Sequence, residues 1–103
     1  MYGTLARARV KPGKADELAR VFEQNVELPE GSISVSVLRT DSDPDQVFIT
    51  GVFASREAYQ RNAASPEQDA RFRRMRELLV ADPEWHDGEV IFARHRAEAE
   101  SRA

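Results

Sequence analysis

The sequence contains no cysteine, which excludes disulfide bridges, thiolate metal ligands and thiol nucleophiles. It also lacks any run of about 18 consecutive apolar residues, the length that a membrane-spanning helix requires. The N-terminus, Met1-Tyr2-Gly3-Thr4-Leu5, has neither the basic region nor the apolar run of a signal peptide. We therefore expect a soluble, cytoplasmic protein without a membrane partner.

Neither sign of charge is in large excess. The 15 basic and 18 acidic residues leave a net charge of -3, which gives no general attraction for nucleic acid. The five glycines do not have the spacing of a phosphate-binding loop. His86 and His95 lie too far apart to form a helical ligand pair, even with Asp87 beside the first, so we expect no metal site.

What the chain does have is enough apolar material for one core. Its 103 residues are 41% hydrophobic, and neither an internal repeat nor a low-complexity linker divides them. We expect a single domain over residues 1–96. Residues 97–103 are polar, lack apolar periodicity and are expected to fray.

Periodicity predicts the secondary structure. Four segments with alternating or continuous apolar residues predict strands: 2–10, 33–38, 47–53 and 89–95. Apolar residues at helical spacing predict a first helix over 15–26 and a second between Ser55 and Asp82-Pro83. The second helix is expected to break near Ala64, with Ser55 capping its first piece and Ser65-Pro66 opening its second.

The order of these elements is β-α-β-β-α-β. Because such crossovers are right-handed, both helices must cover one face of a four-stranded antiparallel sheet, which is a ferredoxin-like α+β fold. One alternating set of strand residues is expected under the helices: Val35, Val37, Ile49 and Phe53. The other set would lie on the open face: Leu5, Leu38, Phe48, Val52 and Ile91. An uncovered apolar face predicts a face-to-face homodimer, although several serines and threonines dilute it.

Several short motifs follow one another in a recognisable order: Lys11-Pro12-Gly13-Lys14 with Leu18, Phe53-Ala54-Ser55-Arg56-Glu57-Ala58-Tyr59, Ser65-Pro66 with Phe72, and Val90-Ile91-Phe92. This order resembles the antibiotic biosynthesis monooxygenase family of dimeric α+β barrel proteins over nearly all of residues 2–95. The resemblance implies a dimeric barrel. Some members are cofactor-independent oxygenases of anthrones or quinols, some degrade haem, and others have no known activity.

The chain departs from parts of the family pattern. Many members carry tryptophan at the position of Phe53 and histidine at that of Asn62. The residues of the haem-degrading branch are missing on the first strand, at Asn62 and at Phe72, which argues against haem degradation. The anthrone-oxidising branch resembles this chain in a tyrosine at Tyr59, but its catalytic set is carried over only in part.

Three polar residues are candidates for catalysis. Asn62 lies on the inward stripe of the second helix, where its amide would bind a ligand oxygen or serve as a local cap at the helix break. Tyr59 lies one turn away, and its hydroxyl would donate to a substrate carbonyl or phenolate. The alternative is that the Tyr59 ring belongs to the core and its hydroxyl is solvated. His95 is a weaker candidate for proton transfer, with solvation as the alternative.

Large apolar residues would line a cavity for a flat aromatic molecule between helices and sheet: Phe22, Phe53, Phe72, Met75 and Phe92. The alternative is that the same residues fill a core. Trp85-His86 is expected in the connection before the last strand, as a lid over the cavity or as a dimer contact.

From the resemblance and these residues we expect a cofactor-independent monooxygenase that oxidises a small electron-rich aromatic molecule, such as a quinol or anthrone, with O2. The alternative is a non-catalytic dimeric α+β barrel protein that holds a small apolar metabolite, and the lack of a clear general base favours it.

Overall fold

The computed structural model describes residues 1–24 and 28–96 of the chain. It contains seven elements: β1 (Tyr2–Arg9), α1 (Ala15–Glu23), β2 (Ser32–Arg39), β3 (Gln46–Phe53), α2 (Arg56–Ala63), α3 (Pro66–Glu77) and β4 (Glu84–Glu89). The expected continuation of the first helix to Val26 and the expected frayed tail over 97–103 lie outside the described residues.

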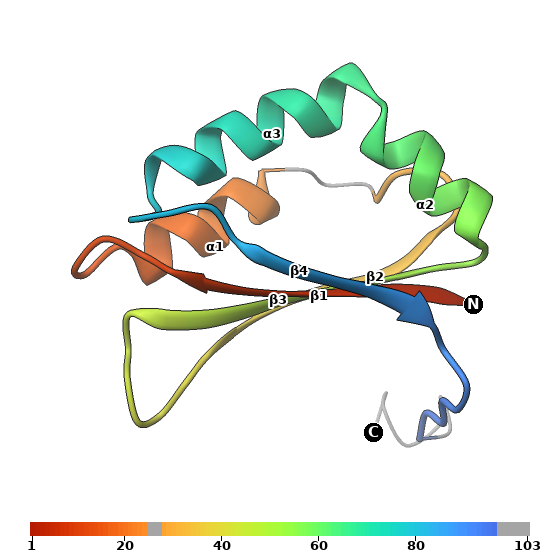
Figure 1. Ribbon diagram of the computed structural model, residues 1–103, viewed down its shortest axis with the longest axis horizontal. Helices are drawn as coiled ribbons and strands as arrows, with labels where there is room; N and C mark the ends of the chain where they lie inside the picture. The colour runs from red at the N-terminus through yellow and green to blue at the C-terminus, as the bar shows by residue number, and fades with distance from the viewer. Residues whose placement is uncertain (25–27, 97–103) are drawn as a thin grey trace.

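The strands form one antiparallel sheet in the order β2-β3-β1-β4. All three helices lie on the same side of this sheet, and the other side is left without a covering layer (Figure 1). The ferredoxin-like α+β fold expected from the sequence is therefore confirmed, with the second helix in two pieces. The helices of the described residues are too short and too polar to cross a bilayer.

The break between α2 and α3 has a local cause. The Ser55 side chain accepts a hydrogen bond from the Ala58 backbone N–H, and Ser65 does the same for Gln68, both at 3.1 Å. Each serine therefore satisfies one of the donors that a helix leaves free at its N-terminus. Pro66 occupies the first turn of α3, where its missing N–H costs nothing. Both caps and the break near Ala64 confirm the sequence prediction.

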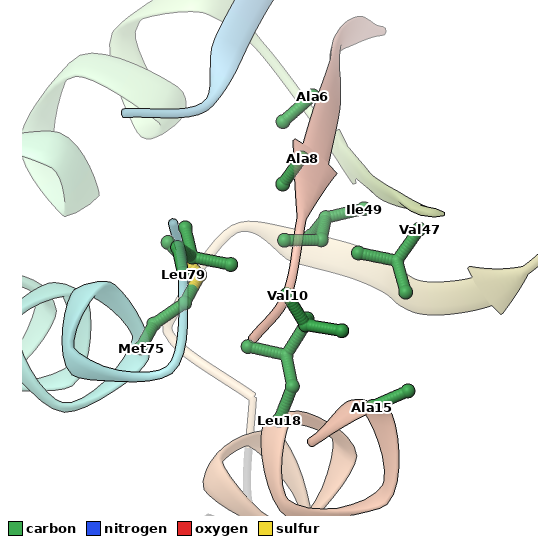
Figure 2. Close-up of a cluster of buried hydrophobic side chains, with 9 residues drawn as sticks. All are labelled: Ala6, Ala8, Val10, Ala15, Leu18, Val47, Ile49, Met75 and Leu79. Carbon is green, nitrogen blue, oxygen red and sulfur yellow. The ribbon is translucent and has the colours of Figure 1, made fainter. Parts of the chain in front are cut away.

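The packed core lies under α1 and the C-terminal half of α3. It consists of nine buried apolar residues that converge from β1, β3 and the two helices (Figure 2): Ala6, Ala8, Val10, Ala15, Leu18, Val47, Ile49, Met75 and Leu79. The β1 members are mostly alanines, so the helices approach the central strand closely at this end. At the other end of the sheet the helical layer and the strands enclose a cavity.

The position of the fourth strand was predicted wrongly. The apolar run at residues 90–92 suggested a strand over 89–95, but β4 spans Glu84–Glu89 and is polar apart from Trp85 and Gly88. The reason lies in β1, whose first residue Tyr2 pairs with Glu89. Beyond this pair the Val90 N–H still donates to the Met1 carbonyl oxygen at 3.0 Å, and Met1 is the last residue on that side that could offer a partner. At an edge strand, exposed polar side chains carry no burial penalty, and hydrophobic periodicity therefore gives no signal.

The residues after β4 turn to the side of the sheet opposite the helices (Figure 1). Ile91 and Phe92 are 90% and 70% exposed there. Ile91 was expected within the open sheet face but lies beyond it. Leu5 and Leu38, which are 40% and 56% exposed, do occupy that face, together with the half-buried Phe48 and Val52.

Gly31 provides a test of the contact between the β2 entrance and α2. Its φ is 84°, and a Cβ at this position would lie 2.6 Å from the Ala58 Cβ. Gly13 has a similar φ of 76° but open space around it. We expect Gly13→Ala to lower the free energy of unfolding by about 1–2 kcal/mol through backbone strain alone. Gly31→Ala should cost about 1–3 kcal/mol more, because the helix must also shift.

Urea unfolding of both variants measures this difference. Equal losses for the two substitutions would show that α2 yields freely and that the Gly31 contact does not fix its position.

Candidate functional site

A cavity of about 440 Å³ lies between the helical layer and the sheet. This volume is within the range of about 300–1,000 Å³ that is typical of sites for small organic ligands. Aromatic and aliphatic side chains from all layers supply most of its wall: Phe22, Leu28, Val35, Ile49, Phe53, Phe72, Met75 and Trp85. Polar side chains also reach the wall from all four strands and from α2 and α3: Thr4, Ser32, Ser34, Thr50, Tyr59, Asn62, Gln68, Asp69, Arg71 and Asp87.

Most of the residues expected to line an aromatic site do so. Phe22, Phe53, Phe72 and Met75 contribute to the wall, and Tyr59 and Asn62 project from α2 into the same space. The filled-core alternative holds in part, because Met75 also belongs to the packed core and Phe22 and Phe72 pack against it.

Phe92 and His95 are not part of the cavity. Both are exposed and belong to the segment 90–96, which leaves β4 toward the side of the sheet opposite the helices (Figure 1). Their placement follows from the end of the β1–β4 ladder at Glu89, which releases the chain before it reaches either residue. As a result, the cavity wall contains no histidine among the described residues.

Tyr59 is held by rings on two sides. Its ring centroid lies 5.3 Å from that of Tyr2 and 5.3 Å from that of Phe53, the latter in an edge-to-face arrangement. Its hydroxyl donates to Asp87 Oδ1 at 3.0 Å. Burial raises the pKa of the Tyr59 phenol above its ordinary value; the hydrogen bond with Thr4 opposes this rise, and the adjacent Asp87 carboxylate adds to it.

Asp87 is a site residue that the sequence analysis missed. It faces the helical side of β4 directly opposite Thr4, whose hydroxyl donates to the same Oδ1 at 2.6 Å. Thr4, Tyr59 and Asp87 all line the cavity, and we call these three residues the hydroxyl–carboxylate cluster. The available signal was the alternation of Trp85 and Asp87, which places them on one face of a strand, but the segment was interpreted as a connection.

Asn62 retains a free amide. At the helix break its backbone carbonyl accepts from the Ser65 N–H at 3.0 Å and from the Ser65 hydroxyl at 2.8 Å. The capping at this point is thus done by the Asn62 backbone and by Ser65. The half-buried Asn62 side chain makes no hydrogen bond with the described residues and is available to a ligand.

Trp85 and Arg71 complete the wall from opposite layers. Trp85 belongs to β4 rather than to a connection, and it lies on the same side of the strand as Asp87. Arg71 projects from α3 and donates to Gln68 Oε1 at 2.6 Å. Burial, with the nearby Arg74, lowers the pKa of the Arg71 guanidinium below its usual value. The cavity therefore has the Asp87 carboxylate on its sheet side and, on its helix side, the Arg71 guanidinium and the Asp69 carboxylate, which is paired with Arg73.

Comparison with known proteins gives this architecture a family. The family model for antibiotic biosynthesis monooxygenases matches residues 1–74, which include β1 through most of α3. The chain belongs to this family. No curated protein sequence matches the chain closely enough to count as a relative.

Solved structures with the same fold include several family members. A candidate monooxygenase of this family from Chloroflexus aurantiacus has 26% sequence identity and a TM-score of 0.78, with 91% of this chain and 96% of that chain covered. SnoaB, a cofactor-independent oxygenase from Streptomyces nogalater, was solved as an asparagine-to-alanine mutant. Its structure has 18% identity and a TM-score of 0.76, covering 89% of this chain and 94% of that chain.

The environment of Tyr59 predicts that its phenol ionises at a higher pH than an ordinary tyrosine. In an alkaline titration followed by phenolate absorbance, the folded protein should show a step above the ordinary tyrosine pKa, and Tyr59→Phe should abolish it. Because the folded-state pKa is raised, the stability linked to Tyr59 is complete below the unfolded-state pKa and is lost as the pH rises through the folded-state value.

Tyr2→Phe is the matched control and should leave this step in place. If the absorbance step at high pH persists in Tyr59→Phe, it comes from a group other than Tyr59.

Proposed function

We propose that this protein is a cofactor-independent monooxygenase that oxidises a small electron-rich aromatic molecule, of the quinol or anthrone type, with O2 in the cytoplasm. The observation that carries the proposal is the largely apolar cavity with Tyr59 and the unpartnered Asn62 amide on neighbouring turns of α2. Family membership supports the class of reaction, and SnoaB, which shares the fold, is a cofactor-independent oxygenase, which supports a reaction without a cofactor.

The reaction requires little chemistry from the protein. An activated methylene loses a proton, and the resulting anion passes an electron to O2. The radical pair then forms a C–O bond, and loss of water from the hydroperoxide leaves a carbonyl. One oxygen atom of O2 is retained in the product and the other leaves as water, while all electrons come from the substrate. The cavity has to stabilise the anion and exclude bulk water.

The described side chains suit these two tasks. The Asn62 amide can donate to an oxygen substituent on which negative charge develops, and Tyr59 lies on the same stripe to fix the position of the ring. Phe22, Phe72 and Trp85 cover the ring faces with apolar surface and keep water from the reacting carbon. His95, expected as a proton carrier, lies outside the cavity and has no place in this proposal.

The alternative is a binding protein that holds an apolar metabolite without changing it. The observation in its favour is that the described cavity wall contains no histidine to move a proton near neutral pH. A binder would consume no O2 above the spontaneous rate.

Oxygen uptake with a panel of anthrones and quinols separates the two functions. We expect uptake above the spontaneous rate and about 10- to 100-fold slower turnover in both variants, because Asn62→Ala loses a contact to the charged transition state and Tyr59→Phe loses the hydroxyl that helps to position the ring. Gln60→Ala, on the exposed side of α2, is the matched control and should retain wild-type rates. Wild-type rates in both site variants would remove these residues from the mechanism, and no uptake would favour the binder.

We also propose that two copies associate through the open face of the sheet. Leu5, Leu38, Phe48 and Val52 place apolar surface on this face, and the segment with Ile91 and Phe92 adds more on the same side. Apolar surface of this extent on a soluble chain is usually an interface, and an isologous contact would cover the face of both copies at once.

Sedimentation velocity at micromolar concentration tests this association. The wild type should sediment as a dimer, and Leu38→Glu should dissociate at least about 10-fold more readily, because each copy would bury a carboxylate. Ala70→Glu introduces the same charge on the exposed surface of α3 and should leave the dimer intact. A wild type that sediments as single subunits would contradict the proposal.

A further inference from the structure

The hydroxyl–carboxylate cluster has more hydrogen-bond acceptor sites than donor protons. Thr4 and Tyr59 each have one hydroxyl proton, and both protons are directed to Asp87 Oδ1. No hydrogen bond from the described residues reaches the other carboxylate oxygen, Oδ2. An ionised carboxylate accepts hydrogen bonds and cannot donate them. The cluster therefore offers a ligand the lone pairs of the two hydroxyls and of the carboxylate, and it has no proton left to donate.

We propose that Thr4, Tyr59 and Asp87 form an acceptor end of the cavity that selects aromatic molecules carrying a neutral hydroxyl donor and rejects those with only a carbonyl or ether oxygen. This inference rests on the proposed function and refines its substrate class. It reverses the role expected for Tyr59, which was to donate to a substrate carbonyl or phenolate. A quinol hydroxyl can donate a hydrogen bond to this cluster. A quinone carbonyl oxygen is itself an acceptor and would face the lone pairs of the cluster without a proton between them.

The arrangement is fixed by the fold. Thr4 and Asp87 are direct partners in the β1–β4 ladder, so their side chains emerge side by side on the helical side of the sheet. Tyr59 arrives from α2, with its ring held between Tyr2 and Phe53. Because three separate elements converge on one carboxylate oxygen, the direction of both hydroxyl protons is set before a ligand enters.

A cationic donor fits the cavity less well than a neutral hydroxyl. Arg71 lines the same cavity from α3, and the charge of the nearby Asp69 is balanced by Arg73 at 2.8 Å, so an ammonium group would be repelled by the Arg71 guanidinium while it approached Asp87. The wall between them is aromatic and aliphatic. A neutral ring with a hydroxyl on its edge satisfies the acceptor end without bringing a second positive charge into this space.

The test uses equilibrium binding and needs no turnover. Isothermal calorimetry compares naphthol, its methyl ether and the naphthylmethylammonium ion, which share one ring system. We expect the wild type to bind naphthol about 10-fold more tightly than the ether, with the ammonium ion weaker than naphthol. In Asp87→Asn the amide oxygen can still accept from Thr4 and Tyr59, while an N–H₂ donor replaces Oδ2. The preference for naphthol should then disappear.

Glu89→Gln is the matched control. It removes the same charge two residues further along β4, at a side chain that neither lines the cavity nor makes a hydrogen bond with the described residues, and it should keep the preference. The inference is overturned if naphthol and the ether bind equally to the wild type, if neither binds, if the ammonium ion binds best, or if Asp87→Asn keeps the preference. A preference for naphthol without oxygen uptake on any quinol or anthrone would instead overturn the monooxygenase proposal alone.

Discussion

The register between β1 and β4 is the constraint on which the rest of the site depends. Because Tyr2 pairs with Glu89, Thr4 must face Asp87 and Ala6 must face Trp85. A shift by one residue would turn Asp87 and Trp85 to the open face of the sheet and leave the cavity without its carboxylate. The same register ends the ladder at Glu89 and so sends the apolar residues that follow away from the helices. One pairing pattern thus determines both the polar chemistry of the cavity and part of the outer surface.

The second determinant is the division of the helical layer. Ser65 and Pro66 start a new helix directly after α2, so the α2–α3 unit bends over the sheet rather than packing along it as one rod. Under α1 and the end of α3, the small side chains of β1 let helix and sheet meet and form a dry core. Beyond this core, the rings of Phe22, Phe53 and Phe72 line the cavity. Core and cavity thus occupy neighbouring parts of the same interface between layers, and Ile49 and Met75 belong to both.

The sequence was sufficient for the fold class, for three of the four strands and for both helix caps, because these depend on local periodicity and on residues such as Ser55 and Pro66. It also placed Tyr59, Asn62 and the aromatic wall together. It failed at β4, where Trp85 and Asp87 lie in an edge strand whose polar composition resembles a loop. Asp87 acquires its role only through Thr4, 83 positions away in the chain, and no local pattern contains such a pairing. His95 and Phe92 were misplaced by the same error.

The edge position of β4 also bears on how this cavity evolves. Strands β1 and β3 are each held by two neighbours, whereas β4 has one, and its side chains are all exposed. Residues such as Trp85 and Asp87 therefore contribute little burial to the folding free energy, while they face whatever the cavity contains. Mutations here can alter ligand preference with a small loss of stability, so divergent descendants of one ancestral scaffold can acquire new substrates without rebuilding the core.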